Sequence, residues 1–287
     1  MSFLSNLFGK KSNLQVDEKM IHKNSVVVYD GEEIELDDED VENLRVYEEN
    51  KDGDAKAQYF AGKALFDYAN GNYFAIERGE EALELLKNAA DGGIAEANKL
   101  IGDYYLTKRY GKEDYATALE WYKKGAELGD PEAYWKVGNV YQNGNGVEKN
   151  PYEAFGYYLK GAEMGEPCSM SKVGIAYYEG KILEQDKEKA FPFLKGAYEQ
   201  GEKRFYCGYY LALCYFKGEC VEKNPEKCVE ILEDLCFSKG LFEDEEAELL
   251  LYCYENGVGT SVNYDAANRL RAKMKEQDDM FSLLLDE

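Results

Sequence analysis

Histidine and cysteine are the side chains of this sequence with the widest chemical range, and their number limits what they can do. The single histidine, His22, lies in a polar stretch ahead of the patterned part of the chain. A Ser-His-Asp or Cys-His catalytic arrangement would have to use it, and a histidine-rich metal site would need more than one. A lone histidine in such a stretch is typical of a solvated side chain, so we expect no catalytic residue and no metal ligand here.

The seven cysteines also lack the spacing of a metal site, because none forms a Cys-x-x-Cys pair. Cys214, Cys228, Cys236 and Cys253 fall at small or apolar positions of the repeat pattern described below, where cysteine acts as a small buried apolar residue. The N-terminus MSFLSNLFGKK carries its basic residues after a short apolar patch, the reverse of a secretion signal. We therefore expect a cytoplasmic protein whose cysteines are reduced.

Glycine loops and acidic runs do not indicate a cofactor either. Gly144-x-Gly146 and Gly257-x-Gly259 follow predicted helices and lack a following Gly-Lys-Ser/Thr, so they are loops and not phosphate cradles. The acidic run Asp37–Asp40 lacks the alternating ligands and central glycine of a calcium-binding loop. We expect no catalytic site, no cofactor and no metal.

An internal repeat organises most of the chain. Small residues recur at steps of 36, 36, 36, 38 and 38 residues, at Ala82, Ala118, Ala154, Ala190, Cys228 and Ala266. In a second column, a small residue stands three positions before a tyrosine, as in Gly138 and Tyr141. Such offsets place residues on one helix face, so each repeat predicts two antiparallel helices that approach closely at small residues.

Two further columns predict where the helices end and begin. Glycines at 93, 129, 165 and 201 are typical of left-handed helix C-caps. Pro131 fits the first turn of the helix that follows Gly129. The stretch Ala118–Val147 shows the complete unit: a helix, a Gly-Asp-Pro corner, a second helix and a glycine loop.

This order of residues resembles Sel1-like repeats, which are relatives of the tetratricopeptide family. The resemblance implies an all-α fold, an α-solenoid of about six helix pairs over residues 53–277. Some secreted, cysteine-rich Sel1 proteins have been linked to β-lactam binding and carry a regular disulfide in each repeat. The corresponding Ala126, Ala162 and Tyr198 are not cysteines, which argues against secretion and against a β-lactam-binding hydrolase.

The segments outside the repeats have separate predictions. Residues 1–24 form a flexible or docking N-terminal arm, and residues 25–52 form a β-hairpin around Asp30-Gly31 plus a capping helix. Asp37 is the expected N-cap of that helix, and Val41, Leu44 and Tyr47 form its apolar stripe. The last repeat helix is predicted over about residues 264–277, followed by a C-terminal cap at 278–287 or, alternatively, a short docking peptide.

By analogy with the family, the first helix of each pair lines a concave surface. Counting from the Gly138 column gives the predicted partner-binding residues Glu132, Trp135, Asn139, Gln142, Tyr178, Tyr206, Tyr209, Phe216 and Tyr252. Tryptophan and tyrosine are the residue types that anchor protein interfaces. The alternative is that distortion of the superhelix buries these rings in the core.

The net charge of −23, from 57 acidic and 34 basic residues, restricts the partners. Such a chain repels nucleic acids and anionic lipid surfaces and attracts basic proteins, although acidity also serves solubility alone. Our first hypothesis is a non-enzymatic scaffold that binds a protein or peptide, with a bacterial immunity protein that neutralises a basic toxin as its sharper form. The alternatives are a regulatory adaptor docked through the N-terminal arm and the β-lactam-binding enzyme.

Overall fold

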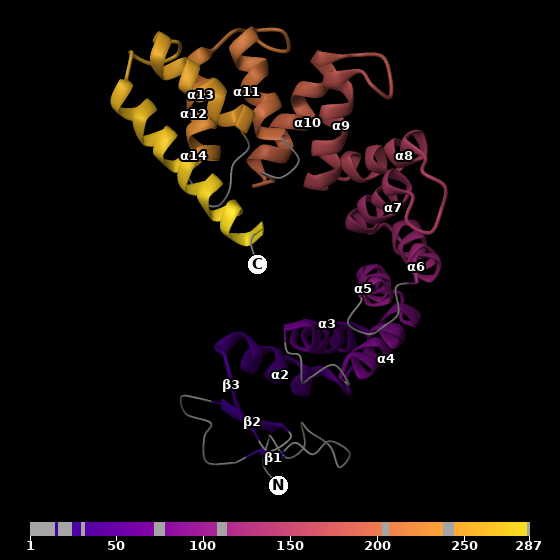
Figure 1. Cartoon of the computed structure of the whole chain (residues 1–287). Helices are drawn as coiled ribbons and strands as arrows, with labels where there is room; N and C mark the ends of the chain where they lie inside the picture. The colour runs from indigo at the N-terminus through magenta and orange to yellow at the C-terminus, as the bar shows by residue number, and fades with distance from the viewer. Residues whose placement is uncertain are drawn as a thin grey trace. The chain divides into compact units, whose positions relative to one another are not determined.

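The computed structural model describes residues 15–16, 25–29, 32–71, 78–107, 114–202, 207–237 and 244–285 of the chain. Most of these residues are helical (Figure 1). The chain divides into two compact units, residues 1–149 and residues 150–287. We call them the first and second unit and describe each by itself.

Three short strands precede the helices of the first unit. β1 (Gln15–Val16), β2 (Ser25–Tyr29) and β3 (Glu32–Leu36) form an antiparallel sheet in the order β1-β2-β3. In the register of β2 and β3, Val27 pairs with Ile34. The Asp30-Gly31 turn lies outside the described residues, so the two-residue hairpin stays a prediction, and so does the role of the arm.

The described part of the first unit continues with α2 (Asp38–Asn50), α3 (Ala55–Gly71), α4 (Arg78–Asp91), α5 (Ala95–Leu106), α6 (Tyr115–Glu127) and α7 (Pro131–Asn143). The Asp37 side chain accepts a hydrogen bond from the Asp40 amide at 2.8 Å, as expected of an N-cap. Leu44 and Tyr47 are buried, but Val41 is 36% exposed. The predicted stripe is wrong at Val41, because α2 packs mainly on α3 and only the positions that face α3 are covered.

The second unit contains α8 (Pro151–Glu163), α9 (Pro167–Glu179), α10 (Lys187–Glu199), α11 (Cys207–Lys217), α12 (Pro225–Phe237), α13 (Asp244–Asn256) and α14 (Tyr264–Leu285). Consecutive helices pack side by side in pairs, which is the arrangement that the repeat columns predict. Among the described residues, no helix is both long enough and apolar enough to span a bilayer.

The corner before α7 shows how the sequence starts and ends its helices. Gly129 has a left-handed φ of 92° after the end of α6, and the Asp130 side chain accepts a hydrogen bond from the Glu132 amide at 3.0 Å. Pro131 is the first residue of α7. The predicted corner is therefore confirmed, and the donor that proline lacks would have no partner at this position anyway.

The close approach of paired helices is confirmed at the glycine column. A Cβ atom at Gly174 of α9 would lie 2.8 Å from Cγ and 3.0 Å from the backbone nitrogen of Leu194 on α10. Leu194 and its neighbours Ala190 and Ala197 are fully buried. The small residue is thus required by steric contact between the two helices.

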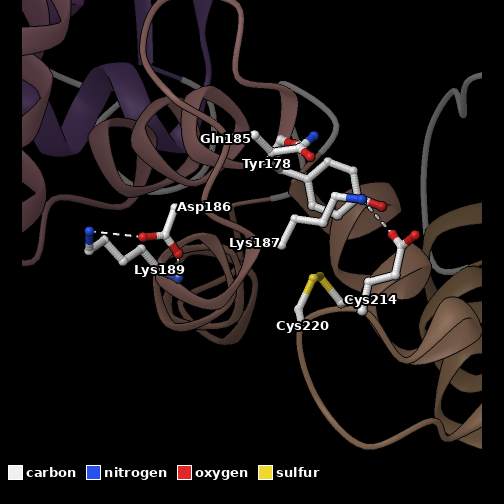
Figure 2. The surroundings of a disulfide bond; sticks show 8 residues. Tyr178, Gln185, Asp186, Lys187, Lys189, Cys214 and Cys220 are labelled. Carbon is white, nitrogen blue, oxygen red and sulfur yellow. Dashed lines mark hydrogen bonds and ion pairs between the residues drawn. A yellow bond between two sulfur atoms is a disulfide. The ribbon is translucent and has the colours of Figure 1, made fainter.

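The cysteine predictions are confirmed in part. Cys214, Cys228, Cys236 and Cys253 are all fully buried. The prediction that the cysteines are reduced is wrong for Cys214, which forms a disulfide with Cys220 (Figure 2). The left-handed Gly218 at the end of α11 turns the chain back on itself, so two residues six apart in sequence come within 5.2 Å between Cα atoms.

The last helix is longer than predicted. α14 does not end at residue 277 but continues to Leu285. The segment from Asp278 to Leu285 contains no glycine or proline that would stop a helix. The side chains near this end lie outside the description, so the capping role of the tail stays a prediction.

The steric requirement at Gly174 can be tested by substitution. We expect Gly174→Ala to lower the free energy of unfolding by about 1–3 kcal/mol, because the added methyl group overpacks against Leu194. Urea unfolding followed by circular dichroism measures this change. The matched control is Gly156→Ala in α8, where an added Cβ meets no atom within 4 Å. This control should raise stability by about 0.5–1 kcal/mol, and equal effects at both sites would contradict the close-approach interpretation.

Candidate functional site

The predicted site residues of the first unit lie on α7, beside the neighbouring helix α5. Glu132 forms an ion pair with Lys99 at 2.7 Å. Three residues on, Trp135 is half-buried, and the Nζ atom of Lys136 lies 5.3 Å from its ring centre. Asn139 and Gln142 follow on the same helix and are partly buried. The structure therefore brings these four predicted residues onto one helix.

Charges on this face are paired within the protein. Asp103 of α5 accepts hydrogen bonds from the Tyr122 hydroxyl at 2.6 Å and from Lys136 Nζ at 2.8 Å. The Lys99–Glu132 pair joins the same two helices, α5 and α7. A basic partner would have to displace a lysine to reach either carboxylate, so this face offers little unpaired negative charge.

The described rings of the second unit form two groups of contacts, one between α9 and α11 and one between α11 and α13. Tyr209 contacts Tyr210 with ring centres 5.7 Å apart, and Tyr210 contacts Tyr178 at 5.0 Å. Phe216 contacts Tyr252 at 6.1 Å in an edge-to-face geometry. We call Tyr209, Tyr210, Phe216 and Tyr252 the aromatic face. Tyr252 is its most accessible ring, with 49% of its surface exposed.

One predicted residue, Tyr178, does not contribute to the aromatic face. Tyr178 is only 6% exposed and belongs to the hydrophobic core, so its ring lies beneath the face and not on it. The cause is Tyr210, whose ring packs on Tyr178. Tyr206 lies outside the described residues, so its place stays a prediction.

Tyr210 was missed by the sequence reasoning. The equivalent positions in the two preceding repeats are Lys136 and Lys172, so the column gives no sign of an aromatic residue. The role of Tyr210 is visible only in the structure. Its ring contacts Tyr178, and the Tyr210 hydroxyl donates a hydrogen bond to Glu179 at 2.5 Å. Tyr210 thereby connects α9 and α11.

Two exposed carboxylates lie beside the aromatic face. Glu245 and Glu248 are on α13, and after burial they are the main causes that raise the pKa of Tyr209. Within the part of the chain that the structure describes, neither carboxylate has an ion-pair or hydrogen-bond partner. An aromatic ring with unpaired carboxylates attracts cations through its face and through charge, so this surface suits a lysine or arginine side chain.

A buried cysteine and glutamate elsewhere in this unit do not form a reactive site. Cys168 Sγ donates a hydrogen bond to Glu202 Oε2 at 2.9 Å, and both residues are buried. A neighbouring carboxylate disfavours the thiolate form that a nucleophile needs. Among the described residues, no group of three or more His, Cys, Asp or Glu side chains is placed to hold a metal ion.

Comparison with known families agrees with the helix pairing. The Sel1 repeat family matches residues 55–94, 95–130, 131–166, 169–202, 209–233 and 247–279. The chain belongs to the Sel1 repeat family. The six matched segments confirm the resemblance seen in the repeat columns. No curated protein sequence matches the chain significantly.

Solved Sel1 structures share this fold. The protective antigen c5321 of uropathogenic Escherichia coli aligns over 82% of the chain with 26% identity and a TM-score of 0.66. The alignment covers only 48% of that protein, so the chain spans about half its length. A Sel1 repeat protein from Oxalobacter formigenes aligns over 77% of the chain and 82% of its own length, with 24% identity and a TM-score of 0.62.

An immunity protein, Pa5087 from Pseudomonas aeruginosa, is also similar to the chain. It aligns over 77% of the chain and 81% of its own length, with 19% identity and a TM-score of 0.42. This degree of similarity carries no argument about function.

The structure predicts opposite results for removing two neighbouring hydroxyl groups. The Tyr178 hydroxyl is buried and has no hydrogen-bond partner among the described residues, so Tyr178→Phe should leave the free energy of unfolding unchanged or raise it by about 1 kcal/mol. Tyr210→Phe removes the bond to Glu179 and should lower it by about 1 kcal/mol. Urea unfolding at neutral pH measures both.

Alkaline pH provides the control for the Tyr178 variant. Burial raises the pKa of Tyr178 to about 12, whereas an unfolded tyrosine titrates near 10. The folded state therefore holds this proton more tightly, and the wild-type protein should lose stability between about pH 10 and 12 relative to Tyr178→Phe. A stability difference that stays constant from pH 8 to 11 would contradict the buried, unpartnered hydroxyl.

Proposed function

We propose that this protein is a non-enzymatic interaction scaffold that binds a basic protein or peptide through the concave face of its repeats. Sel1 repeat proteins are generally interaction scaffolds, and their non-repeating residues are the part of the sequence that can distinguish partners. The observation that carries the proposal is the aromatic face of the second unit, with Glu245 and Glu248 unpaired beside Tyr209.

Charge complementarity supports a basic partner. The chain carries a net charge of −23, and the first unit neutralises its inner carboxylates with Lys99 and Lys136. The carboxylates beside Tyr209 are instead available to a cation from outside. An arginine or lysine side chain placed against Tyr209 or Tyr252 would gain a cation–π contact and an ion pair together.

We include the predicted residues of the first unit in the same proposal. Trp135 presents a half-buried ring, and its Nε1 atom is buried without a partner among the described residues. Glu132, Asn139 and Gln142 lie on the same helix and offer polar contacts around it. We assign to Trp135 an anchoring contact with an uncharged part of the partner, because the neighbouring charges are already paired.

A sharper form of the proposal is an immunity protein that neutralises a basic bacterial toxin. It is supported by the net charge of the chain, which suits a basic partner. Co-expression with the product of the neighbouring open reading frame tests it, with growth of the host as the readout. We expect growth to be rescued by the wild-type chain and lost with Tyr209→Ala/Tyr252→Ala. A neighbour that is harmless when expressed alone would contradict the immunity role.

The aromatic face is tested by binding of a fluorescein-labelled nona-arginine peptide, followed by fluorescence anisotropy. We expect Tyr209→Ala/Tyr252→Ala to raise the Kd by about 5- to 30-fold, because the loss of the two anchoring rings together costs about 1–2 kcal/mol. Glu245→Gln/Glu248→Gln should also raise the Kd, with a smaller effect at higher salt, where exposed charges are screened.

The matched control for the aromatic substitution is Tyr152→Ala. Tyr152 lies on α8 and is 71% exposed, so its removal changes the exposed aromatic area without touching the aromatic face. We expect an unchanged Kd for this variant. Equal losses for Tyr152→Ala and Tyr209→Ala/Tyr252→Ala would show that the peptide binds to the acidic surface in general.

A further inference from the structure

The Cys214–Cys220 disulfide is an addition to a loop that folds without it in the preceding repeat. After α11, the Gly218 amide donates to the Cys214 carbonyl at 3.0 Å, and the Asn224 amide donates to the Tyr215 carbonyl at 2.9 Å. After α9, the same two bonds join Gly180 to Ala176 and Asp186 to Tyr177, at 3.0 and 2.9 Å.

The two loops align without a gap, so their residues can be compared one by one. Ala176 and Ile182 stand where the later loop has Cys214 and Cys220. Because the earlier loop reaches the same backbone arrangement without cysteines, the loop fold does not require the disulfide. The disulfide is therefore an addition to a backbone arrangement that forms without it.

The disulfide lies next to a charge that reaches the preceding repeat. Glu219, the neighbour of Cys220, forms an ion pair with Lys187 at 2.7 Å. Lys187 Nζ in turn lies 5.1 Å from the ring centre of Tyr178, beneath the aromatic face. Figure 2 shows Lys187 between Tyr178 and the disulfide-bonded loop. The tethered loop thus holds a lysine over a ring that contacts Tyr210.

The disulfide restrains the acidic partner of this ion pair. The side chains of Lys187 and Glu219 are 23% and 41% exposed, and ion pairs with that exposure contribute little on their own. Glu219 stands between the left-handed Gly218 and Cys220, so the disulfide restricts the conformations that it can adopt. Loss of the disulfide would let Glu219 leave Lys187, while the backbone bonds at both ends of the loop remain.

We propose that Cys214–Cys220 is a redox-modification site, and that its reduction by a dithiol opens the aromatic face to its basic partner. This proposal rests on the proposed function for its binding effect. In the oxidised protein, Lys187 lies over Tyr178 and opposes the approach of a second cation. In the reduced protein, Glu219 no longer fixes Lys187, so the ammonium group can move away from the Tyr178 ring and no longer opposes a cation beside Tyr210.

The reaction is a balanced thiol–disulfide exchange. A thiolate of the dithiol attacks Sγ of Cys220, which is partly exposed, and Sγ of Cys214 leaves and takes up a proton. The second thiolate of the dithiol then attacks the mixed disulfide and releases Cys220 as a thiol. Two electrons pass from the dithiol to the protein, and the dithiol ends as a disulfide.

Two measurements on the full-length chain test the site without any partner. The five free cysteines are buried, so N-ethylmaleimide should label Cys220 in the native protein only after treatment with dithiothreitol. Hydrogen–deuterium exchange of residues 219–223 should become faster after the same treatment. Labelling of Cys220 before reduction, or exchange that does not change, would overturn the proposal.

The binding effect is measured with the fluorescein-labelled nona-arginine peptide in both redox states. We expect reduction to lower the Kd by about two- to fivefold, the range that loss of one exposed ion pair allows. Cys214→Ala/Cys220→Ile introduces the residues of the preceding loop. This variant should bind with the Kd of the reduced protein, and dithiothreitol should not change that Kd. Lys187→Gln, which removes the opposing charge itself, should give the oxidised protein the same tighter binding.

The outcomes separate this proposal from the proposed function. If reduction speeds the hydrogen–deuterium exchange of residues 219–223 but the Kd for the peptide is equal in the two redox states, the proposed effect of the disulfide on the aromatic face is overturned. If the peptide binds neither state while labelling and exchange respond as expected, the redox site stands and the proposed function fails.

Discussion

The close packing of paired helices against small residues is the constraint on which the rest of this structure depends. Gly174 must lack a side chain because Leu194 occupies that space, and Gly102 stands in the same relation to the buried ring of Tyr122. Helices held this close fix which positions turn inward to the core. The remaining positions of α7, α9, α11 and α13 are thereby free to vary, and the proposed partner-binding residues are among them.

The distribution of charged residues, and not the net charge, shows which carboxylates are available to a partner. In the first unit, Glu132 and Asp103 each have a lysine partner at 2.7–2.8 Å, so these carboxylates stabilise contacts between α5 and α7. In the second unit, Glu245 and Glu248 have no such partner among the described residues and lie near Tyr209. The same residue type thus serves as a structural contact in one unit and as an available charge in the other. A net charge of −23 does not distinguish the two.

Comparing the loops of successive repeats shows which residues depart from the pattern. Two successive loops of the second unit share the same backbone hydrogen bonds, one with Ala176 and Ile182 and the other with a disulfide. The earlier loop reaches this backbone arrangement without a disulfide, so the disulfide of the later loop is additional to it. The addition lies where Glu219 reaches Lys187 and, through it, Tyr178.

The sequence by itself determined the family, the helix pairing, the corner at Asp130-Pro131 and the burial of the column cysteines. These features follow from local rules, because a helix face, a proline turn and a left-handed glycine are set by residues a few positions apart. Only the tertiary structure decided that Tyr178 is buried, that Tyr210 belongs to the aromatic face and that Cys214 pairs with Cys220. The first two depend on how neighbouring repeats rotate against each other, and the third depends on the path of a loop. The spacing of the repeat columns specifies neither the rotation between repeats nor the path of the loop.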